Sequence, residues 1–155
     1  MLASLLTHGH LDQLPLDAPG RAFFCCARFR GLGTVELVSC YFDVRGGLKA
    51  NSSLIASLGA RQRAHGMPTI FGGDFNLDPA VAQATLAAGT LGAVVHELSG
   101  MGTCGREEKW TDRDFFVVTG KLDQLGPHAE LVLNVGIPQH RPVIMWNRCD
   151  CSHLC

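Results

Sequence analysis

The sequence lacks the features that would assign it to a membrane, secreted or disordered class of protein. No apolar run reaches the roughly 18 residues that a membrane-spanning helix needs. Residues 1–6 are apolar, but they are too few for the hydrophobic region of a signal peptide, and no basic segment precedes them. Low-complexity tracts and long charge runs are also missing, so disorder is not expected. These absences predict a soluble, intracellular protein of the cytoplasm or nucleus, without a membrane partner.

A strong net charge is missing as well. The 13 lysines and arginines and the 14 aspartates and glutamates give a formal net charge of −1. The chain therefore has no global basic field, and contact with nucleic acid would depend on a few local side chains. The candidates are Arg61, Arg63, Arg106, Lys109 and Arg113, although solvated surface charge is the default interpretation of each.

The seven cysteines are an odd number and are scattered through the chain. This pattern favours free thiols in a reducing compartment over a disulfide framework. The C-terminal segment 149–155 offers three cysteines and His153, four soft ligands that could hold Zn²⁺. That segment lacks two cysteines separated by two residues, so free thiols are the preferred interpretation.

The 155 residues suit a single domain in which short β-rich runs alternate with two helical patterns. This pattern predicts an α/β (α+β) layered domain with mostly antiparallel pairing, beginning with a β-hairpin. Asn51, Ser52 and Ser53 offer caps for the first helix, and the polar segment 99–111 should be an exposed loop. The predicted strands are 22–29, 34–42, 69–71, 91–98, 115–119, 130–135 and 142–146, and the predicted helices are 51–65 and 79–88.

One junction between a strand and a helix stands at the centre of this pattern. Residues 69–71 favour a strand, and the glycines at 72 and 73 would let the backbone turn tightly. The Asp78–Pro79 pair suits the start of a helix, with the aspartate as N-cap and the proline at the first position. Asp74 and Asn76 lie two residues apart, so in an extended segment their side chains would point the same way.

Polar residues lie at the ends of three predicted strands. They are Asp74 with Asn76, Asp114 just before an apolar strand, and His140 between two prolines. A carboxylate, a carboxamide and an imidazole can together activate a water molecule and stabilise charge on a phosphate. Taken singly, Asp74, Asn76 and Asp114 are ordinary turn or loop residues, and a lone histidine is more often structural than catalytic. From spacing alone, both interpretations stay open.

Three strings, in this order, resemble the C-terminal half of the endonuclease/exonuclease/phosphatase superfamily. They are GGDFNLDP at 72–79, TDRDFFVV at 111–118 and PQHRPVIM at 138–145. Members of this superfamily hydrolyse phosphodiesters or phosphomonoesters with Mg²⁺, and their fold is a sandwich of two β-sheets with helices outside. The resemblance covers residues 34–146. It includes Tyr41, which is similar to a tyrosine that many nucleases of the family carry on the corresponding strand.

The resemblance implies a role for each matching residue. Asp74 would orient or deprotonate the attacking water, and Asn76 would bind the scissile phosphate. Asp114 would support His140, which would stabilise the charge on the phosphate. Tyr41 and the string that contains His140 favour a nuclease over an inositol phosphatase.

Two departures from the family pattern lower the expected activity. The asparagine and the metal-holding glutamate of the family's first strands are not found before Ala22, and Gln139 replaces the acidic residue beside His140. A hard dication prefers charged oxygen ligands. We therefore expect weak or lost Mg²⁺ binding, and no metal ligand can be assigned. Residues 1–147 would form an N-terminally truncated domain of this family, and residues 148–155 a cysteine-rich tail.

The sequence therefore predicts a Mg²⁺-dependent phosphodiester hydrolase-like domain of the endonuclease type, impaired and similar to retroelement-associated nucleases, with nucleic acid as its substrate. A non-catalytic binding or scaffold domain derived from that fold is the first alternative. A phosphomonoesterase similar to inositol phosphatases is the second. The missing segment could also be supplied by another chain or lost through an incomplete gene model. The oligomeric state and the identity of the substrate stay open.

Overall fold

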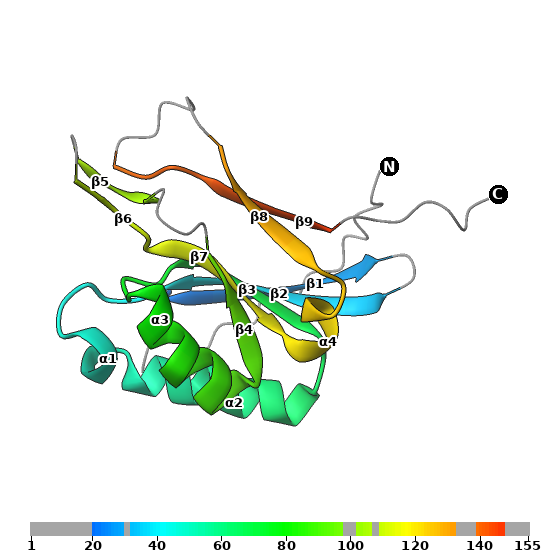
Figure 1. The fold of residues 1–155 in the computed structure, drawn as a ribbon. Helices are drawn as coiled ribbons and strands as arrows, with labels where there is room; N and C mark the ends of the chain where they lie inside the picture. Colours follow the sequence, from blue (N-terminus) through cyan, green and yellow to red (C-terminus); the bar gives the residue numbers. More distant parts are fainter. Residues whose placement is uncertain (1–19, 30–31, 98–101, 107–108, 133–138, 148–155) are drawn as a thin grey trace.

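The computed structural model describes residues 20–29, 32–97, 102–106, 109–132 and 139–147. Its main feature is a five-stranded sheet in the order β1-β2-β3-β7-β4 (Figure 1). These strands are β1 (Ala22–Phe29), β2 (Gly33–Tyr41), β3 (Thr69–Asp74), β7 (Asp114–Thr119) and β4 (Ala93–His96). Among the described residues, no helix is both long and apolar enough to cross a membrane.

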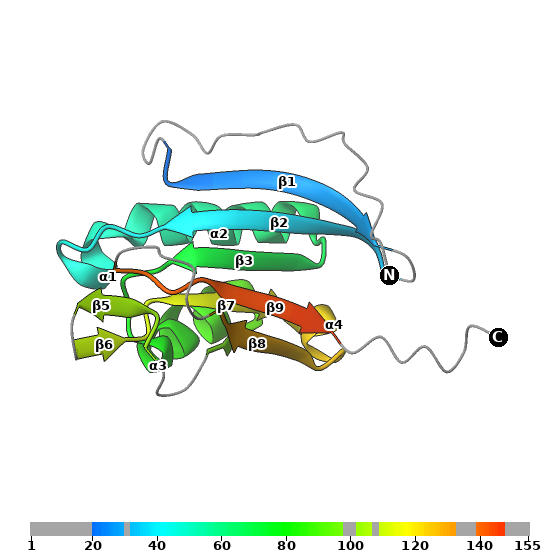
Figure 2. The same ribbon diagram turned by 90° about the horizontal axis from the view of Figure 1, so that it is seen from above.

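The remaining elements lie on the two sides of this sheet. The helices are α1 (Gly47–Ala50), α2 (Ser52–His65), α3 (Pro79–Ala82), the π-helical segment η1 (Gln83–Leu91) and α4 (Gly120–Asp123). Two antiparallel two-stranded sheets complete the described residues: β5 (Cys104–Arg106) with β6 (Lys109–Thr111), and β8 (Pro127–Leu131) with β9 (Val143–Asn147). Helices α2, α3 and η1 cover one face of the sheet, and β8 and β9 lie across the other (Figures 1 and 2).

Strand pairing is mostly antiparallel, as the sequence predicted. β1 and β2 form the expected hairpin, from Ala22 opposite Cys40 to Phe29 opposite Gly33. The exception is the parallel pair β2–β3. Parallel neighbours need a long crossover connection, and α2 supplies it.

The two faces of the sheet differ in how deeply they are buried. The helix-side face, covered by α2, α3 and η1, contributes to a cluster of 16 buried residues that includes Phe24, Phe71 and Phe115. The opposite face, here called the site face, contains Ile70, Phe116 and Val118 on β3 and β7. Its cluster has only three buried residues, and partly buried side chains surround them. The predicted sandwich is therefore strongly asymmetric in the described residues.

The prediction of a tight turn at the central glycines was wrong. Gly72 and Gly73 belong to β3, and the strand ends at Asp74. A Cβ atom on Gly73, at φ 151°, would lie 1.9 Å from the carbonyl oxygen of Cys40, and one on Gly72 would lie 2.7 Å from the Phe116 ring. The glycines are needed because neighbouring groups approach the strand closely, not because the chain turns there.

The helix after this strand begins as predicted but ends later. Asp78 accepts a hydrogen bond from the N–H of Ala80 at 2.9 Å, and Pro79 takes the first helical position. The expected end at residue 88 was wrong, because α3 continues into η1 as far as Leu91. Gly92, at φ 59°, then ends the helical segment.

Asn51 precedes α2, but its side chain does not cap the helix. The side-chain amide donates instead to the carbonyls of Asp43 and Gly47 at 3.0 and 2.9 Å, and its oxygen accepts from Arg21 at 2.8 Å. Asn51 therefore fixes the loop that leads into α2, a role that depends on contacts outside the helix.

The expected loop at 99–111 was wrong in part, because the described residues of this segment include β5 and β6. Its glycines are compatible with strands here, since Gly105 packs directly against the backbone of Lys109 and Trp110. The strand expected at 130–135 begins earlier, at Pro127, and residues 133–138 lie outside the described residues. Helices α1 and α4 were not predicted. The cysteine-rich segment 148–155 also lies outside the described residues.

Candidate active site

Two carboxylates meet where β3 and β7 pair. Asp74, the last residue of β3, lies directly opposite Asp114, the first residue of β7. Because side chains alternate along strands, both point to the site face, as do Ile70 and Phe116. Like charges in directly opposed positions repel each other. The arrangement is therefore unfavourable for the isolated sheet, which is typical of a functional position.

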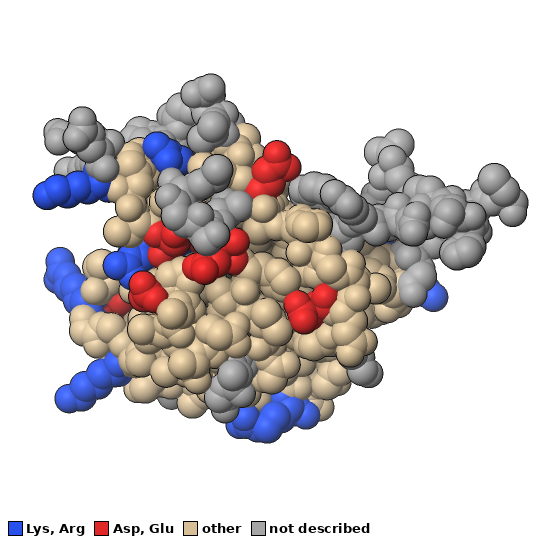
Figure 3. All heavy atoms as spheres, viewed as in Figure 1, with Lys and Arg blue, Asp and Glu red and all other residues tan. Residues whose placement is uncertain are grey.

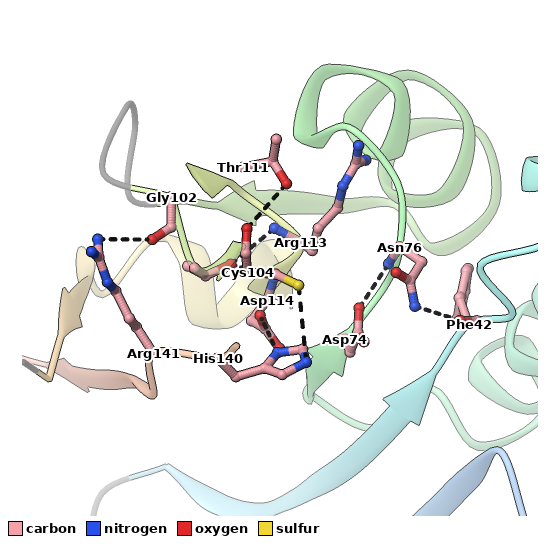
Figure 4. Close-up of polar contacts among 11 residues, drawn as sticks. Phe42, Asp74, Asn76, Gly102, Cys104, Thr111, Arg113, Asp114, His140 and Arg141 are labelled. Atoms are coloured by element: carbon pink, nitrogen blue, oxygen red, sulfur yellow. Dashed lines mark hydrogen bonds and ion pairs between the residues drawn. The ribbon is translucent and has the colours of Figure 1, made fainter. Parts of the chain in front are cut away.

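The imidazole of His140 completes this group. Its Nδ1 lies 3.1 Å from Oδ2 of Asp114, and the two side chains point toward each other in Figure 4. One ligand atom from each of Asp74, Asp114 and His140 lies within 4.8 Å of the others. The structure therefore brings together the three charged or titratable residues that the sequence had separated by up to 66 positions.

The β5–β6 hairpin positions the segment that contains His140. Cys104 and His140 form an antiparallel backbone bridge. On either side of it, the N–H of Arg141 donates to the carbonyl of Thr103 at 2.7 Å, and the N–H of Gly105 donates to the carbonyl of Gln139 at 3.0 Å. Gln139, the departure from the family pattern, is exposed and has a positive φ of 69°. Its backbone thus supports the histidine.

Thr103 is a buried positioning residue that the sequence analysis missed. Its Oγ1 accepts hydrogen bonds from the N–H groups of Arg113 and Asp114 at 2.9 and 2.8 Å. These bonds attach the residue before β5 to the start of β7, and they fix the backbone from which the Asp114 side chain projects. No local sequence signal identifies this role, because a threonine in a polar segment is common in loops.

Asn76 lies beside Asp74, but the reason given for it from the sequence was wrong. The segment is not extended there, since Asn76 has a left-handed φ of 48°. Its N–H donates to Oδ1 of Asp74 at 3.1 Å, and its side-chain amide donates to the carbonyl of Phe42 at 2.8 Å. Beneath it, Phe75 stacks on Phe115 with 4.4 Å between ring centroids. Asn76 therefore links the carboxylate to the backbone of Phe42, the residue that follows β2.

Tyr41 lies at the edge of this group. It is opposite Asp74 in the parallel pairing of β2 with β3, and half of its surface is exposed. Arg61, one of the candidate phosphate contacts, does not reach the site, because it pairs with the buried Glu36 at 2.7 Å on the helix-side face. Arg113, in contrast, directly precedes Asp114.

The environment of the site changes the acidity of two groups. Burial, and then the charge of Asp114, raise the pKa of the Asp74 carboxyl, while hydrogen bonds from Asn76 and the charge of His140 act in the opposite direction. Burial, and then the charges of Asp74 and Asp114, raise the pKa of the Cys104 thiol. The raised pKa makes Asp74 a stronger base than an exposed aspartate.

A cavity of about 260 Å³ adjoins the Asp114 carboxylate and the His140 imidazole. Its lining includes Gly73, Asp114, Phe116, His140, Arg141 and Pro142. In Figure 3, acidic side chains gather near α3 and β6, while lysines and arginines project from the edge that carries the β5–β6 hairpin and α1. The surface around the site is therefore mixed in charge.

Comparison with known proteins gives matches in structure. No protein-family model matches the sequence, and no curated protein sequence is significantly similar to it. The endonuclease domain of TRAS1, a telomere-specific non-LTR retrotransposon, is 20% identical with a TM-score of 0.66 over 94% of this chain and 71% of that one. An endonuclease/exonuclease/phosphatase family protein from Bacteroides thetaiotaomicron is 16% identical with a TM-score of 0.53, over 79% and 53% of the two chains. The mannosyl-6-phosphatase Bt3783 of the same organism is 14% identical with a TM-score of 0.52, over 81% and 55%.

These matches confirm the predicted fold. The described residues have the layered α/β fold of the endonuclease/exonuclease/phosphatase superfamily, with a mostly antiparallel sheet. The chain spans between 53% and 71% of the length of these three structures. At identities of 14–20% the likeness concerns the fold, and the activity has to be argued from the site.

Proposed function

We propose that this chain is a phosphodiester hydrolase-like domain of the endonuclease type, with weak activity and with nucleic acid as its substrate. The observation that supports this most strongly is the group of Asp74, Asp114 and His140, whose ligand atoms lie within 4.8 Å of one another beside Asn76. The free thiols of Cys25, Cys40 and Cys104 support a location in the cytoplasm or nucleus.

Each residue would act through the atoms that face the site. Asp74, with its raised pKa, accepts a proton from the attacking water or orients it. Asp114 fixes Nδ1 of His140, which leaves Nε2 to stabilise charge on the phosphate. Asn76 donates from its backbone to Asp74 and contacts the phosphate, and the exposed Tyr41 borders the substrate.

Among the described residues of the site, few oxygen ligands are left for the Mg²⁺ that the family resemblance implies. Mg²⁺ demands near-octahedral coordination by oxygen. The group offers two carboxylates, and Asp114 is already bonded to the imidazole at 3.1 Å. On the other side of the ring, the thiol of Cys104 lies 3.9 Å from Nε2. We therefore propose that the chain binds Mg²⁺ weakly.

This donor set also favours a second candidate, a binding domain that retains the fold without hydrolysis. Such a domain would bind nucleic acid or a phosphorylated ligand at the same edge, where Arg141 lines the same cavity as Asp114 and His140. The two candidates differ in one respect: only the hydrolase requires the proton acceptor at Asp74.

Cleavage assays with the purified chain distinguish the candidates. Supercoiled plasmid, duplex DNA with an abasic site and p-nitrophenyl phosphate are incubated with Mg²⁺ or Mn²⁺, and products are quantified. Asp74→Asn should reduce cleavage at least about 100-fold, the lower range for loss of a general base, while Glu97→Gln, which removes an exposed charge, should not.

Equal cleavage by the parent chain and Asp74→Asn would contradict the hydrolase assignment. Absence of cleavage together with salt-dependent DNA binding, measured by fluorescence anisotropy, would establish the binding domain instead. Turnover of the monoester alone would indicate a phosphomonoesterase.

A further inference from the structure

Arg141 directly follows His140 and is held to the β5–β6 hairpin by its backbone. Its N–H donates to the carbonyl of Thr103 at 2.7 Å, beside the bridge between Cys104 and His140. The next residue, Pro142, favours an extended backbone at Arg141, which suits this pairing. Neighbouring side chains of an extended segment point to opposite sides. The side chains of His140 and Arg141 accordingly extend in different directions in Figure 4.

The guanidinium of Arg141 stacks on an aromatic ring of the same hairpin. Its central carbon lies 3.6 Å from the centroid of the Trp110 ring on β6. A tryptophan ring gives the strongest cation–π contact, and the planar guanidinium is suited to stacking on it. Gly105, which pairs with Trp110 across the hairpin, has no side chain that could come between the two. Nη1 of Arg141 also lies 3.5 Å from the carbonyl oxygen of Gly102. The Arg141 side chain thus adds a second attachment to the backbone bonds.

The imidazole needs such an attachment because it is partly exposed and follows a strained residue. The His140 side chain is 39% exposed, and its Nδ1 lies 3.1 Å from Oδ2 of Asp114. Gln139, the preceding residue, has a left-handed φ of 69°, which is uncommon and unfavourable for a residue with a side chain. Such a conformation persists only where surrounding contacts hold it. The stack of Arg141 on the hairpin is a contact of this kind.

We propose that Arg141 is a positioning residue for His140. Its stack on Trp110 holds the segment against β5, which keeps Nδ1 of the imidazole on the Asp114 carboxylate and leaves Nε2 for the substrate. This role rests on the proposed function in one respect, since His140 must be the group that stabilises charge on the phosphate. The orientation of the ring, in contrast, can be measured without turnover.

Two NMR signals of the full chain report that orientation. The ¹H–¹⁵N spectrum shows which nitrogen of the neutral His140 ring carries the proton, and comparison with His140→Gln assigns the signal. A ring held on Asp114 carries the proton on Nδ1. Amide hydrogen exchange at Gly105, whose N–H donates to the carbonyl of Gln139 at 3.0 Å, reports whether the segment stays on β5. We expect one tautomer and slow exchange in the parent chain.

Variants on both sides of the stack separate its effect from a general loss of stability. Arg141→Met and Trp110→Leu should each give a mixture of tautomers and faster exchange at Gly105. The double variant should be no worse than either single change, because both remove the same contact. Arg141→Lys keeps a cation near the ring and should restore part of the parent behaviour. Arg28→Met, which removes an exposed guanidinium from β1, is the matched control and should change neither signal.

Cleavage kinetics connect the orientation of the ring to the reaction. A misplaced imidazole stabilises the transition state less but leaves substrate binding nearly intact. Arg141→Met should therefore lower kcat about 10- to 100-fold, as misplacement of a catalytic group does, with little change in KM. Absence of cleavage by the parent chain would contradict the proposed hydrolysis, while the two NMR signals would still decide whether Arg141 orients His140.

Three results would overturn the positioning role. The first is a parent-like tautomer and parent-like exchange in both Arg141→Met and Trp110→Leu. The second is additive effects of the two changes, because each residue would then act through other contacts. The third is a rise in KM with kcat and the tautomer unchanged, which would show that Arg141 contacts the substrate directly. If Arg141→Met failed to fold, Trp110→Leu compared with Trp110→Phe, which retains a ring, would decide in the same way.

Discussion

The two faces of the five-stranded sheet differ in what they contribute to the protein. The helix-side face contributes to a cluster of 16 buried residues, whereas the site face has only three buried residues in its cluster. The site face also holds Asp74 and Asp114, whose paired charges oppose folding. The comparison teaches that one face supplies most of the stability, which lets the other tolerate an unfavourable group of polar side chains.

Neighbouring residues on β3 test this comparison most directly, because their side chains point to opposite faces. Phe71 is 1% exposed within the helix-side cluster, while Ile70 is half-buried on the site face. Phe71→Ala should lower the free energy of unfolding by about 3–5 kcal/mol, and Ile70→Ala should lower it clearly less. Urea denaturation followed by circular dichroism measures both, and equal losses would contradict the assignment of stability to one face.

The next largest effect is expected from an ion pair under the helix-side face. Arg61 contacts Oε1 of Glu36 at 2.7 Å, and Glu36 is 1% exposed. Arg61→Met would leave that carboxylate unpaired, and removal of one partner of a buried pair costs about 3 kcal/mol or more. Arg63→Met, on the exposed side of the same helix, is the control and should have little effect. A loss of DNA binding without a loss of stability in Arg61→Met would instead favour a contact with phosphate.

Strands formed by locally β-rich residues could be predicted from the sequence. The run 22–29 coincides with β1, and the pairing with β2 followed from their proximity in the chain. The role of Gly72 and Gly73 could not be predicted from the sequence, because glycine is compatible both with a turn and with the close approach of neighbouring groups to a strand. Only the positions of Cys40 and Phe116, which are distant in sequence, distinguish the two cases.

The same limit applies to the site. Asp74, Asp114 and His140 could be grouped from the order of three motifs, and the structure brings them together. Thr103 and Cys104 could not be included, because their roles depend on hydrogen bonds and pairing with residues 113–114 and 140. Local propensity contains no information on such contacts between distant segments.

A smaller effect on stability is expected where the site face depends on hydrogen bonds. Thr103→Val would leave the N–H groups of Arg113 and Asp114 without the acceptor that now lies 2.9 and 2.8 Å away. An unsatisfied buried group costs about 1–3 kcal/mol, and the imidazole of His140 should lose its fixed orientation. Urea denaturation and the ¹H–¹⁵N spectrum of the histidine rings measure the two effects. Thr111→Val, at an exposed position, is the control; if both variants behaved alike, Thr103 would have no positioning role.

The smallest effect, absent at neutral pH, is expected from a thiol on the helix-side face. Burial raises the pKa of Cys40 from 9.0 to about 12. The folded chain thus retains this proton more strongly than the unfolded chain, so the associated stability is complete below pH 9.0 and is lost as the pH rises toward 12. Between these values, the parent protein should lose roughly 1 kcal/mol more per pH unit than Cys40→Ala. Urea denaturation at pH 8, 9 and 10 compares the slopes, with Cys26→Ala as the control for an exposed thiol. Parallel slopes for the parent and Cys40→Ala would mean that the helix-side face admits solvent, and the contrast between the two faces would then be smaller than the burial of their side chains indicates.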